Sequence, residues 1–420
     1  MQEEGQGRPA WLSRLAPSPH LRPGEARHVA RSFDALPDIA TARALLRMAN
    51  AAAPAGTPTR PLSEELWIYG GGALGKLVHA HLSAVGQRVA GVVDRNAQAC
   101  ARDPDWADVK LLAPDAVPDA VKARALFAVA VVTTHYVPLA DDLRQQGFAR
   151  CIPAYDVTEA FRDQHPLGNG WFAAPLRGTQ LEAADAVLSG LADDASRAHY
   201  LRFAAWRLAR EEWDFASAPV DIATRFLLPE ITPLLRPTER LLDGGAHHGT
   251  VLAQMLAQTG GQMGAAWAVE PDPESRAILQ HAVGTWPAAA RARVQLLDAV
   301  LGARAASATF HDGLGYASQI APTGRQRRRV TPIDAIKLDP TFVKLHLEGA
   351  ELAALQGARE TLLRCRPIVA ATIYHNADGL AATPLWLMQT LPDYRVLLRT
   401  HGWCGTGAVI YAIPKERLRP

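Results

Sequence analysis

Strand-like and helix-like patterns of apolar residues alternate along two separate stretches of this chain. In the first stretch, residues 64–160, the apolar run LWIYG (66–70) leads into a glycine-rich turn and then a helix pattern. Further strand patterns occupy 88–94 and 125–133, and a second helix pattern follows at 138–147. Alternation of this kind is typical of a parallel sheet with helices packed outside it.

The second stretch, residues 237–420, repeats this alternation. Strand patterns are expected at 240–246, 265–270, 293–300, 342–348, 368–375, 394–401 and 407–414. The last two are adjacent and separated by a glycine-rich turn, so they fit an antiparallel hairpin at the edge of a sheet. The sequence therefore predicts a second sheet of the same class that ends in a hairpin.

The remaining segments have helical or irregular patterns. Residues 26–53 read as helix with a proline break, within an N-terminal tail and helical segment that covers 1–60. Residues 178–236 are amphipathic with few strand signals, so we expect a helical connector or lid. The patterns together predict an α/β fold with two Rossmann-like, doubly wound domains, at 64–160 and 237–420, joined by that connector.

The charge balance and the cysteines narrow the function classes. The 420-residue chain has 44 Lys and Arg against 42 Asp and Glu, which argues against a protein that mainly grips nucleic acid or an anionic membrane. Its four cysteines are scattered without a CxxC pair, so we expect neither a structural zinc site nor a disulfide framework. No apolar run approaches the ~20 residues of a membrane span, and the N-terminus lacks the apolar region of a signal peptide. We therefore expect a cytoplasmic protein.

A glycine-rich loop opens the first predicted domain. Gly70, Gly72 and Gly75 form GxGxxG between a strand and a helix, where backbone N–H groups can approach a diphosphate. Asp94 ends the next strand, where an acid can bind ribose hydroxyls. The loop either binds a nucleotide or is a structural turn of the scaffold.

The stretch IYGGGALGKLVHAHLSAVGQRVAGVVDRN (68–96) resembles the N-terminal domain of bacterial sugar O-acyltransferases, and also a domain that precedes some bacterial methyltransferases. This resemblance implies a nucleotide or nucleotide-sugar pocket more than a dehydrogenase site. A pyridine-nucleotide oxidoreductase that uses this loop is nevertheless one alternative function.

A second glycine loop, in the C-terminal domain, places an acid before its glycines. That order suits S-adenosylmethionine (SAM), because Asp243 can hold the ammonium group while the glycines let the backbone approach the methionine moiety. Glu270 ends the next strand and can accept hydrogen bonds from the ribose hydroxyls, and Asp298 ends the third, toward the adenine. The predicted cofactor residues are Asp243, Gly244, Gly245, Ala246, His248, Gly249, Glu270 and Asp298. A structural Rossmann loop is the alternative.

Residues 342–375 carry a further set of motifs, which resembles the FkbM family of SAM-dependent methyltransferases. The family pattern IKxDxEGxE, followed by a helix and a strand after Arg-Pro, is matched by Lys344, Glu348, Gly349, Glu351, Gly357, Arg366 and Pro367. The resemblance extends over about 240–414. It implies transfer of a methyl group from SAM to a hydroxyl of a sugar, a glycan or a polyketide-like metabolite.

The chain departs from this pattern at His346, where the family usually has Asp. A neutral histidine can act as a base near pH 7, so His346 is a candidate to remove the hydroxyl proton without a metal. Loss of activity and a purely structural histidine are the other two interpretations. Glu348 and His375 are further catalytic candidates, because they too lie at the strand ends where α/β sheets bind ligands. No metal-ligand set is predicted, and metal dependence stays open.

Four arginines, Arg325, Arg327, Arg328 and Arg329, form a basic run before an expected strand, VTPID (330–334). A solvated loop is the favoured interpretation, and an anchor for an acceptor phosphate is the alternative.

These observations predict a SAM-dependent O-methyltransferase that acts on a hydroxyl of a sugar, a glycan precursor or a related small metabolite. A catalytically silent nucleotide- or SAM-binding protein and an NAD(P)-dependent oxidoreductase are the alternatives. The expected partner is a small molecule or glycan, not nucleic acid, and association into a homo-oligomer is compatible with this prediction.

Overall fold

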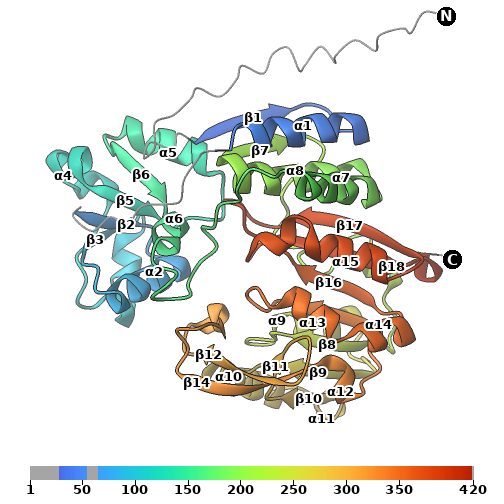
Figure 1. Cartoon of the computed structure of the whole chain (residues 1–420). Helices are drawn as coiled ribbons and strands as arrows, with labels where there is room; N and C mark the ends of the chain where they lie inside the picture. The colour runs from blue at the N-terminus through green and yellow to red at the C-terminus, as the bar shows by residue number, and fades with distance from the viewer. Residues whose placement is uncertain (1–27, 54–64, 419–420) are drawn as a thin grey trace, which may run out of the picture.

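A computed structural model describes residues 28–53 and 65–418 of the protein. The first of its sheets has five strands, all parallel, in the order β4-β3-β2-β5-β6. Its strands are β2 (Leu66–Tyr69), β3 (Val89–Val93), β4 (Leu111–Leu112), β5 (Leu126–Val129) and β6 (Arg150–Pro153). Its longer helices are α2 (Ala73–Ala84) and α5 (Tyr136–Gln145), with α4 (Asp119–Arg124) and α6 (Ala154–Glu159) between and after them. This unit lies to one side of the molecule in Figure 1.

The second sheet has seven strands in the order β10-β9-β8-β15-β16-β18-β17. They are β8 (Arg240–Gly244), β9 (Ala265–Val269), β10 (Val294–Leu297), β15 (Phe342–Leu345), β16 (Ile368–Thr372), β17 (Tyr394–Thr400) and β18 (Ala408–Pro414). Only β18 runs antiparallel to its neighbours, and it forms with the edge strand β17 the predicted hairpin. The predicted α/β fold with two doubly wound sheets is therefore confirmed.

Helices cover both faces of this sheet. The inner strands consequently read as continuous apolar runs, because successive side chains point to opposite, equally buried faces. Leu242 and Val343 contribute to one core, whereas their chain neighbours Leu241 and Phe342 contribute to the other. The helices after the strands are α9 (Thr250–Gln258), α10 (Pro273–Gly284), α13 (Glu351–Gln356), α14 (Arg359–Cys365) and α15 (Ala382–Thr390).

The N-terminal segment differs from the helical prediction over 26–53. Helix α1 (Ile39–Ala51) is present, with Asp38 as its N-cap, but residues 29–33 form a strand, β1. This strand pairs in parallel with β7 (Glu211–Phe215), which lies inside the connector expected to be helical. Neither strand has a partner close in sequence, so no local pattern revealed the pair. The part of the predicted N-terminal tail that precedes residue 28 lies outside the described residues.

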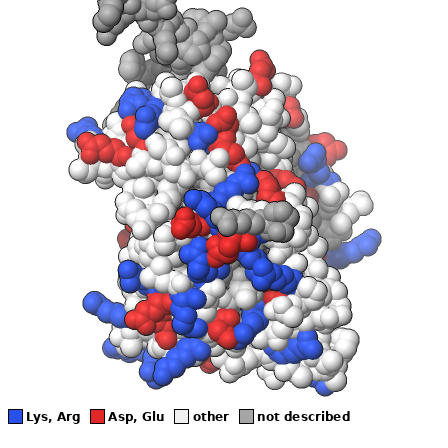
Figure 2. Space-filling view, turned by 90° about the vertical axis from the view of Figure 1, so that its right-hand side faces the viewer, with Lys and Arg blue, Asp and Glu red and all other residues white. Residues whose placement is uncertain are grey.

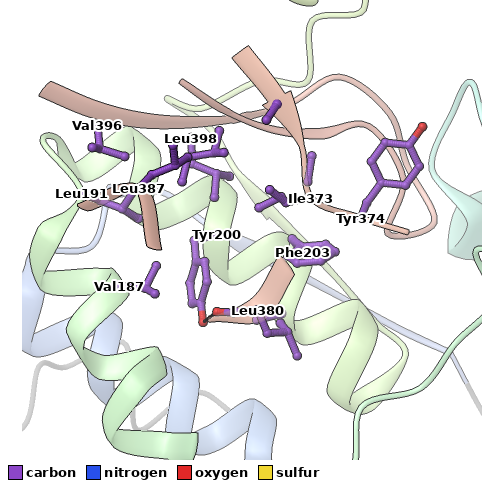
Figure 3. Close-up of a cluster of buried hydrophobic side chains, with 14 of the residues drawn as sticks. Val187, Leu191, Tyr200, Phe203, Ile373, Tyr374, Leu380, Leu387, Val396 and Leu398 are labelled. Carbon is purple, nitrogen blue, oxygen red and sulfur yellow. Dashed lines mark hydrogen bonds between the residues drawn. The ribbon is translucent and has the colours of Figure 1, made fainter. Parts of the chain in front are cut away.

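The connector also contributes to the core rather than only linking two domains. Helix α7 (Thr179–Gly190) precedes helix α8 (Asp194–Ala209), and every residue of α8 from Ser196 to Leu208 is buried. Figure 3 shows Tyr200 and Phe203 of α8 packed among side chains of the seven-stranded unit, including Leu398 of β17. A helix buried on all sides belongs in a protein interior.

A small sheet that the sequence did not predict follows β10. It has the order β11-β14-β12-β13 and consists of β11 (Val300–Leu301), β12 (Ala306–His311), β13 (Gln319–Ile320) and β14 (Gln326–Thr331). Three residues of the arginine run, Arg327, Arg328 and Arg329, lie in β14, so the loop expected there is wrong for them, whereas Arg325 precedes the strand. The strand expected at 330–334 instead begins at Gln326 and ends at Thr331. Strand β14 pairs with β12, which lies earlier in the chain beyond an intervening loop. This pairing holds the arginines of β14 in strand geometry, although the segment has no apolar run that would predict a strand.

Charges are mixed on the molecular surface. Basic and acidic side chains are interspersed on the face shown in Figure 2, in keeping with the near-neutral net charge. Within the described residues, no helix has both the length and the apolar character that a membrane crossing requires.

Candidate functional site

The candidate site lies where the strand order of the seven-stranded sheet reverses. The chain builds outward from β8 through β9 to β10, then returns to the other side of β8 with β15. Ligands of open α/β sheets bind at such a switch point, beyond the carboxyl ends of the strands. A cavity of about 410 Å³ lies there, within the usual size range of small-molecule pockets. Its wall includes residues of both sheet units and of the connector.

The second glycine loop forms one side of this cavity. Gly245 has φ 72°, and a Cβ at this position would lie 2.0 Å from the backbone oxygen of His346, so only glycine fits between β8 and β15. Asp243 is fully buried and pairs with Lys344, whose Nζ lies 2.8 Å from Asp243 Oδ1 and 2.7 Å from the carbonyl oxygen of Gly245. The second carboxylate oxygen of Asp243 is buried with no hydrogen-bond partner. Asp243 thus lies behind the cavity wall, whereas Lys344 is part of it.

Glu270 lines the same cavity from the end of β9. Its two oxygens accept backbone N–H groups of His247, at 2.7 Å, and Asp272, at 2.9 Å. Each carboxylate oxygen has two lone pairs, so both can accept one more hydrogen bond. Burial raises the pKa of Glu270 above its usual range, although the two N–H groups oppose this shift.

Only some of the other predicted cofactor residues line the cavity. Gly245 and Ala246 line the cavity with Glu270, whereas Gly244, His248, Gly249 and Asp298 do not. His248 is exposed and stacks on His247, whose ring centroid is 3.6 Å away. Asp298 forms ion pairs with Arg328 and, at 2.9 Å, with Arg276. Its role at the adenine stays a prediction.

The three predicted catalytic residues come together beyond the ends of β15 and β16. Oε1 of Glu348 lies 3.1 Å from His346 Nε2 and 3.1 Å from His375 Nε2. The His346 nitrogen also lies 3.1 Å from the hydroxyl of Tyr374. His346 and Glu348 line the cavity, and His375 is buried behind them.

The electrostatics of this cluster set the two histidines apart. Burial and the charge of Arg225 lower the pKa of His346 to about 3, so its ring is neutral at pH 7. Burial also disfavours the charged form of His375, but Glu348 and Glu351 outweigh it and raise the pKa of His375 well above the usual value. Despite burial, the adjacent histidines hold the pKa of Glu348 well below its usual range.

Glu351 fixes the orientation of His375. Its Oε1 lies 2.8 Å from His375 Nδ1 and accepts from the hydroxyl of Thr372 and the backbone N–H of Leu347. Its other oxygen accepts from the N–H of Gly349. This role of Glu351 was not predicted from the sequence, since an acid in the first turn of a helix is already explained by the helix dipole.

Several cavity residues lie far from the recognised motifs. Arg225 of the connector donates to the Tyr374 hydroxyl at 3.1 Å, and its Nε is buried without a partner. Thr133, Tyr155 and Asn169 reach the cavity from the first sheet unit and the segment after it. No periodicity or motif marked these residues; the positive φ of Asn169, 74°, is visible only in the structure.

The first glycine loop is held by contacts of its own. Asp94 Oδ2 accepts from the backbone N–H of Gly71 at 2.7 Å, and Oδ1 accepts from Asn96. The buried Trp106 donates to the Gly71 carbonyl at 2.9 Å, and a Cβ on Gly75 would lie 2.0 Å from the oxygen of Gly70. These contacts explain Gly75 and Asp94 as parts of a tight turn. Nucleotide binding by Gly70, Gly72, Gly75 and Asp94 stays a prediction.

The cavity geometry and the glycine loop agree with a comparison of the sequence against known families. Residues 243–401 match the Methyltransferase FkbM domain. This FkbM match supports a methyltransferase, and it spans the loop after β8, Glu270 and the His346–Glu348–His375 cluster. No curated protein matches the chain.

One solved structure shows a similar fold outside the FkbM match as well. The crystal structure of Methyltransferase FkbM from Methylobacillus flagellatus KT aligns with a TM-score of 0.60 at 21% identity, covering 89% of this chain and 100% of that one. Precorrin-6y C5,15-methyltransferase from Geobacter metallireducens GS-15 aligns with a TM-score of 0.28 at 13% identity, covering 47% of this chain and 95% of that one. The first alignment shows that the fold extends beyond the FkbM match.

The raised pKa of Glu270 predicts how the free energy of unfolding depends on pH. A carboxyl whose pKa is higher in the folded protein stabilises it at low pH, and this contribution is lost as the pH rises through the folded pKa. We therefore expect Glu270→Gln, which does not titrate, to gain stability relative to wild type as the pH rises from the usual pKa of a glutamate through the raised pKa of Glu270, and to level off above it. Urea unfolding of both proteins across this range measures the difference. If the stability of Glu270→Gln relative to wild type fell as the pH rose, the raised pKa of Glu270 would be contradicted.

Proposed function

We propose that this protein is a SAM-dependent O-methyltransferase that methylates a hydroxyl of a sugar, a glycan precursor or a related small metabolite. The observation that carries the proposal is that Glu270, His346 and Glu348 line one cavity at the switch point of the sheet. Residues suited to the cofactor and residues suited to the acceptor therefore face the same enclosed space.

The residues around the glycine loop fit SAM. When bound, SAM supplies an electrophilic methyl group on its sulfonium. Gly245 leaves backbone room beside the cavity, and Glu270 has the remaining lone pairs to accept two ribose hydroxyls. The buried, unpartnered oxygen of Asp243 and the Nζ of Lys344 supply charge beside the loop for the amino acid part.

The cluster beyond β15 suits the activation of an acceptor hydroxyl. A hydroxyl is a poor nucleophile until its proton is withdrawn, and His346 offers a neutral ring with its Nε2 beside Glu348. The same nitrogen can take up the proton directly or bind a cation that polarises the hydroxyl. His375, held protonated, keeps Glu348 ionised beside it.

Cavity residues from the first sheet unit and the segment after it support a hydroxyl-rich acceptor. Thr133, Tyr155 and Asn169 bring two hydroxyls and an amide to the cavity, groups that both donate and accept hydrogen bonds. Their origin in and just after the first sheet unit gives that unit a role in acceptor binding, whether or not its own glycine loop holds a nucleotide.

The cysteines fit a cytoplasmic location, because none of the four forms a disulfide: Cys100, Cys151, Cys365 and Cys404.

Isothermal titration with SAM and with S-adenosylhomocysteine tests the donor site. We expect wild type to bind both, and Asp243→Asn and Glu270→Gln to bind roughly 10- to 100-fold more weakly, the size of a lost hydrogen bond to a charged group. Glu274→Gln, an exposed carboxyl variant at the start of α10, is the matched control and should bind like wild type. A folded wild-type protein that binds neither compound would overturn the proposal. An acceptor screen that begins with nucleotide sugars then tests the hydroxyl transfer.

A further inference from the structure

We propose that His346, Glu348 and His375 bind a divalent transition-metal cation at the acceptor end of the cavity. This inference rests on the proposed function and deepens it, because the ion would be the group that polarises the acceptor hydroxyl. Two imidazoles and one carboxylate are a donor set that suits Zn²⁺, Fe²⁺ and related ions, whereas Mg²⁺ and Ca²⁺ prefer oxygen ligands alone.

The spacing of the three side chains fits one shared ion. One ligand atom from each lies within 4.8 Å of the other two, and the two His–Glu distances are both 3.1 Å. Ligand atoms about 2.0–2.1 Å from a tetrahedral Zn²⁺ are roughly 3.3 Å apart, so two of the three edges of the site are already close to that spacing.

A carboxylate outside the proposed ligand set orients His375, as is usual for histidine ligands of metals. Histidine ligands usually donate their second ring N–H to a carboxylate, which fixes the ring and its tautomer. Glu351 lies 2.8 Å from Nδ1 of His375, leaving Nε2 to face Glu348 and His346. A cation bound there would displace to solvent the proton that Nε2 carries in the metal-free protein. Glu351 is itself held by Thr372, Leu347 and Gly349, so this contact is built into the fold.

Burial gives a second, independent reason to expect a cation. His375 is 5% exposed, and neither of its ring nitrogens has a well-aligned hydrogen bond, although carboxylate oxygens lie within 3.1 Å of both. Two carboxylates, Glu348 and Glu351, are buried around this one ring. Glu348 also has φ 50°, a left-handed conformation that is strained in a non-glycine residue and is concentrated at functional sites.

The bound ion would have open positions on the cavity side. His346 and Glu348 line the cavity, and His375 closes the site from behind. Three protein ligands with a free position are the arrangement of catalytic rather than structural zinc. A hydroxyl oxygen of the acceptor could then coordinate the ion, which would polarise it as a Lewis acid. In this arrangement His346 is a ligand and cannot also be the base.

Metal titration of the full-length, tag-free protein tests the inference. The protein is stripped with EDTA, and Zn²⁺ binding is followed by calorimetry and Co²⁺ binding by its visible absorption bands. We expect one ion per chain, loss of that ion in His375→Gln, and roughly 10- to 100-fold weaker binding in Glu351→Gln, the effect of removing an outer-sphere partner. His281→Gln, which removes an exposed histidine of α10, is the control for adventitious binding and should behave like wild type.

Binding of S-adenosylhomocysteine, measured on the same preparations, separates this inference from the proposed function and reports whether each variant folds. Wild-type protein that binds S-adenosylhomocysteine but neither ion would overturn the metal site and leave His346 as the base. Equal Zn²⁺ affinity of wild type and a folded His375→Gln would also overturn it.

Discussion

Replacing His346 with alanine is expected to slow methyl transfer by about 10²–10⁴-fold, the usual contribution of a positioned acid–base group. Its Nε2 lies beside Glu348, and no other imidazole of that cluster lines the cavity, since His375 is buried behind it. The loss is expected whether His346 takes the proton or binds a cation. Release of S-adenosylhomocysteine with an acceptor found by the screen measures kcat.

Two comparisons make this result specific. Affinity for S-adenosylhomocysteine should stay near that of wild type in His346→Ala, because the loss concerns the acceptor end of the cavity. His346→Asp places the acid of the FkbM pattern at this position, and it should retain more activity than His346→Ala if a cation is bound, since a carboxylate can serve as a ligand. A kcat of His346→Ala within threefold of wild type would remove His346 from the reaction.

Arg210→Ala is expected to lower the free energy of unfolding by about 3–5 kcal/mol, because it leaves a buried carboxylate without its counter-charge. Arg210 is 1% exposed; its Nη2 lies 2.9 Å from Asp156 Oδ1 and 2.6 Å from the carbonyl oxygen of Gly170. Burial raises the pKa of Asp156, and the charge of Arg210 offsets only part of this effect. Urea unfolding at pH 7 measures the loss.

A double variant and a surface pair test the reason for this loss. Arg210→Met combined with Asp156→Asn removes both charges, so it should cost clearly less than Arg210→Ala alone. Arg162→Ala breaks the more exposed pair with Glu159 in the same part of the chain and should cost at most about 1 kcal/mol. Equal losses for Arg210→Ala and the double variant would show that lost packing, not the unpaired charge, is responsible.

The pattern of apolar residues was enough to predict three strands of the first sheet, β2, β3 and β5, and all seven strands of the second sheet with its final hairpin. The short strands β4 and β6 were not predicted. Strands such as β8 and β15 are buried on both faces, so their local composition carries the signal without help from distant residues. The glycine loop after β8 could be recognised for a similar reason, because Gly245 must be glycine wherever β8 and β15 lie this close.

Other elements depended on partners far away in the chain. Strand β1 exists because β7, about 180 residues later, pairs with it, and local sequence alone read it as part of a helix. The arginines of α8 made that helix look amphipathic, yet Arg207 is fully buried and donates to the carbonyl oxygens of Asn169, Tyr374 and Gly405. The sequence alone does not distinguish an arginine that donates to buried carbonyl groups from an arginine exposed to solvent.

In the candidate site, too, some features follow from the sequence and others only from the tertiary structure. The sequence by itself determined which strand ends carry the candidate side chains, because motif spacing places His346, Glu348 and His375 after β15 and β16. Only the tertiary structure decided that one oxygen of Glu348 contacts both histidines, that Glu351 orients His375, and that Tyr155, from helix α6 of the first sheet unit, lines the cavity. These contacts join segments that are distant along the chain, and their distances depend on how the sheets and helices pack, which local spacing does not encode.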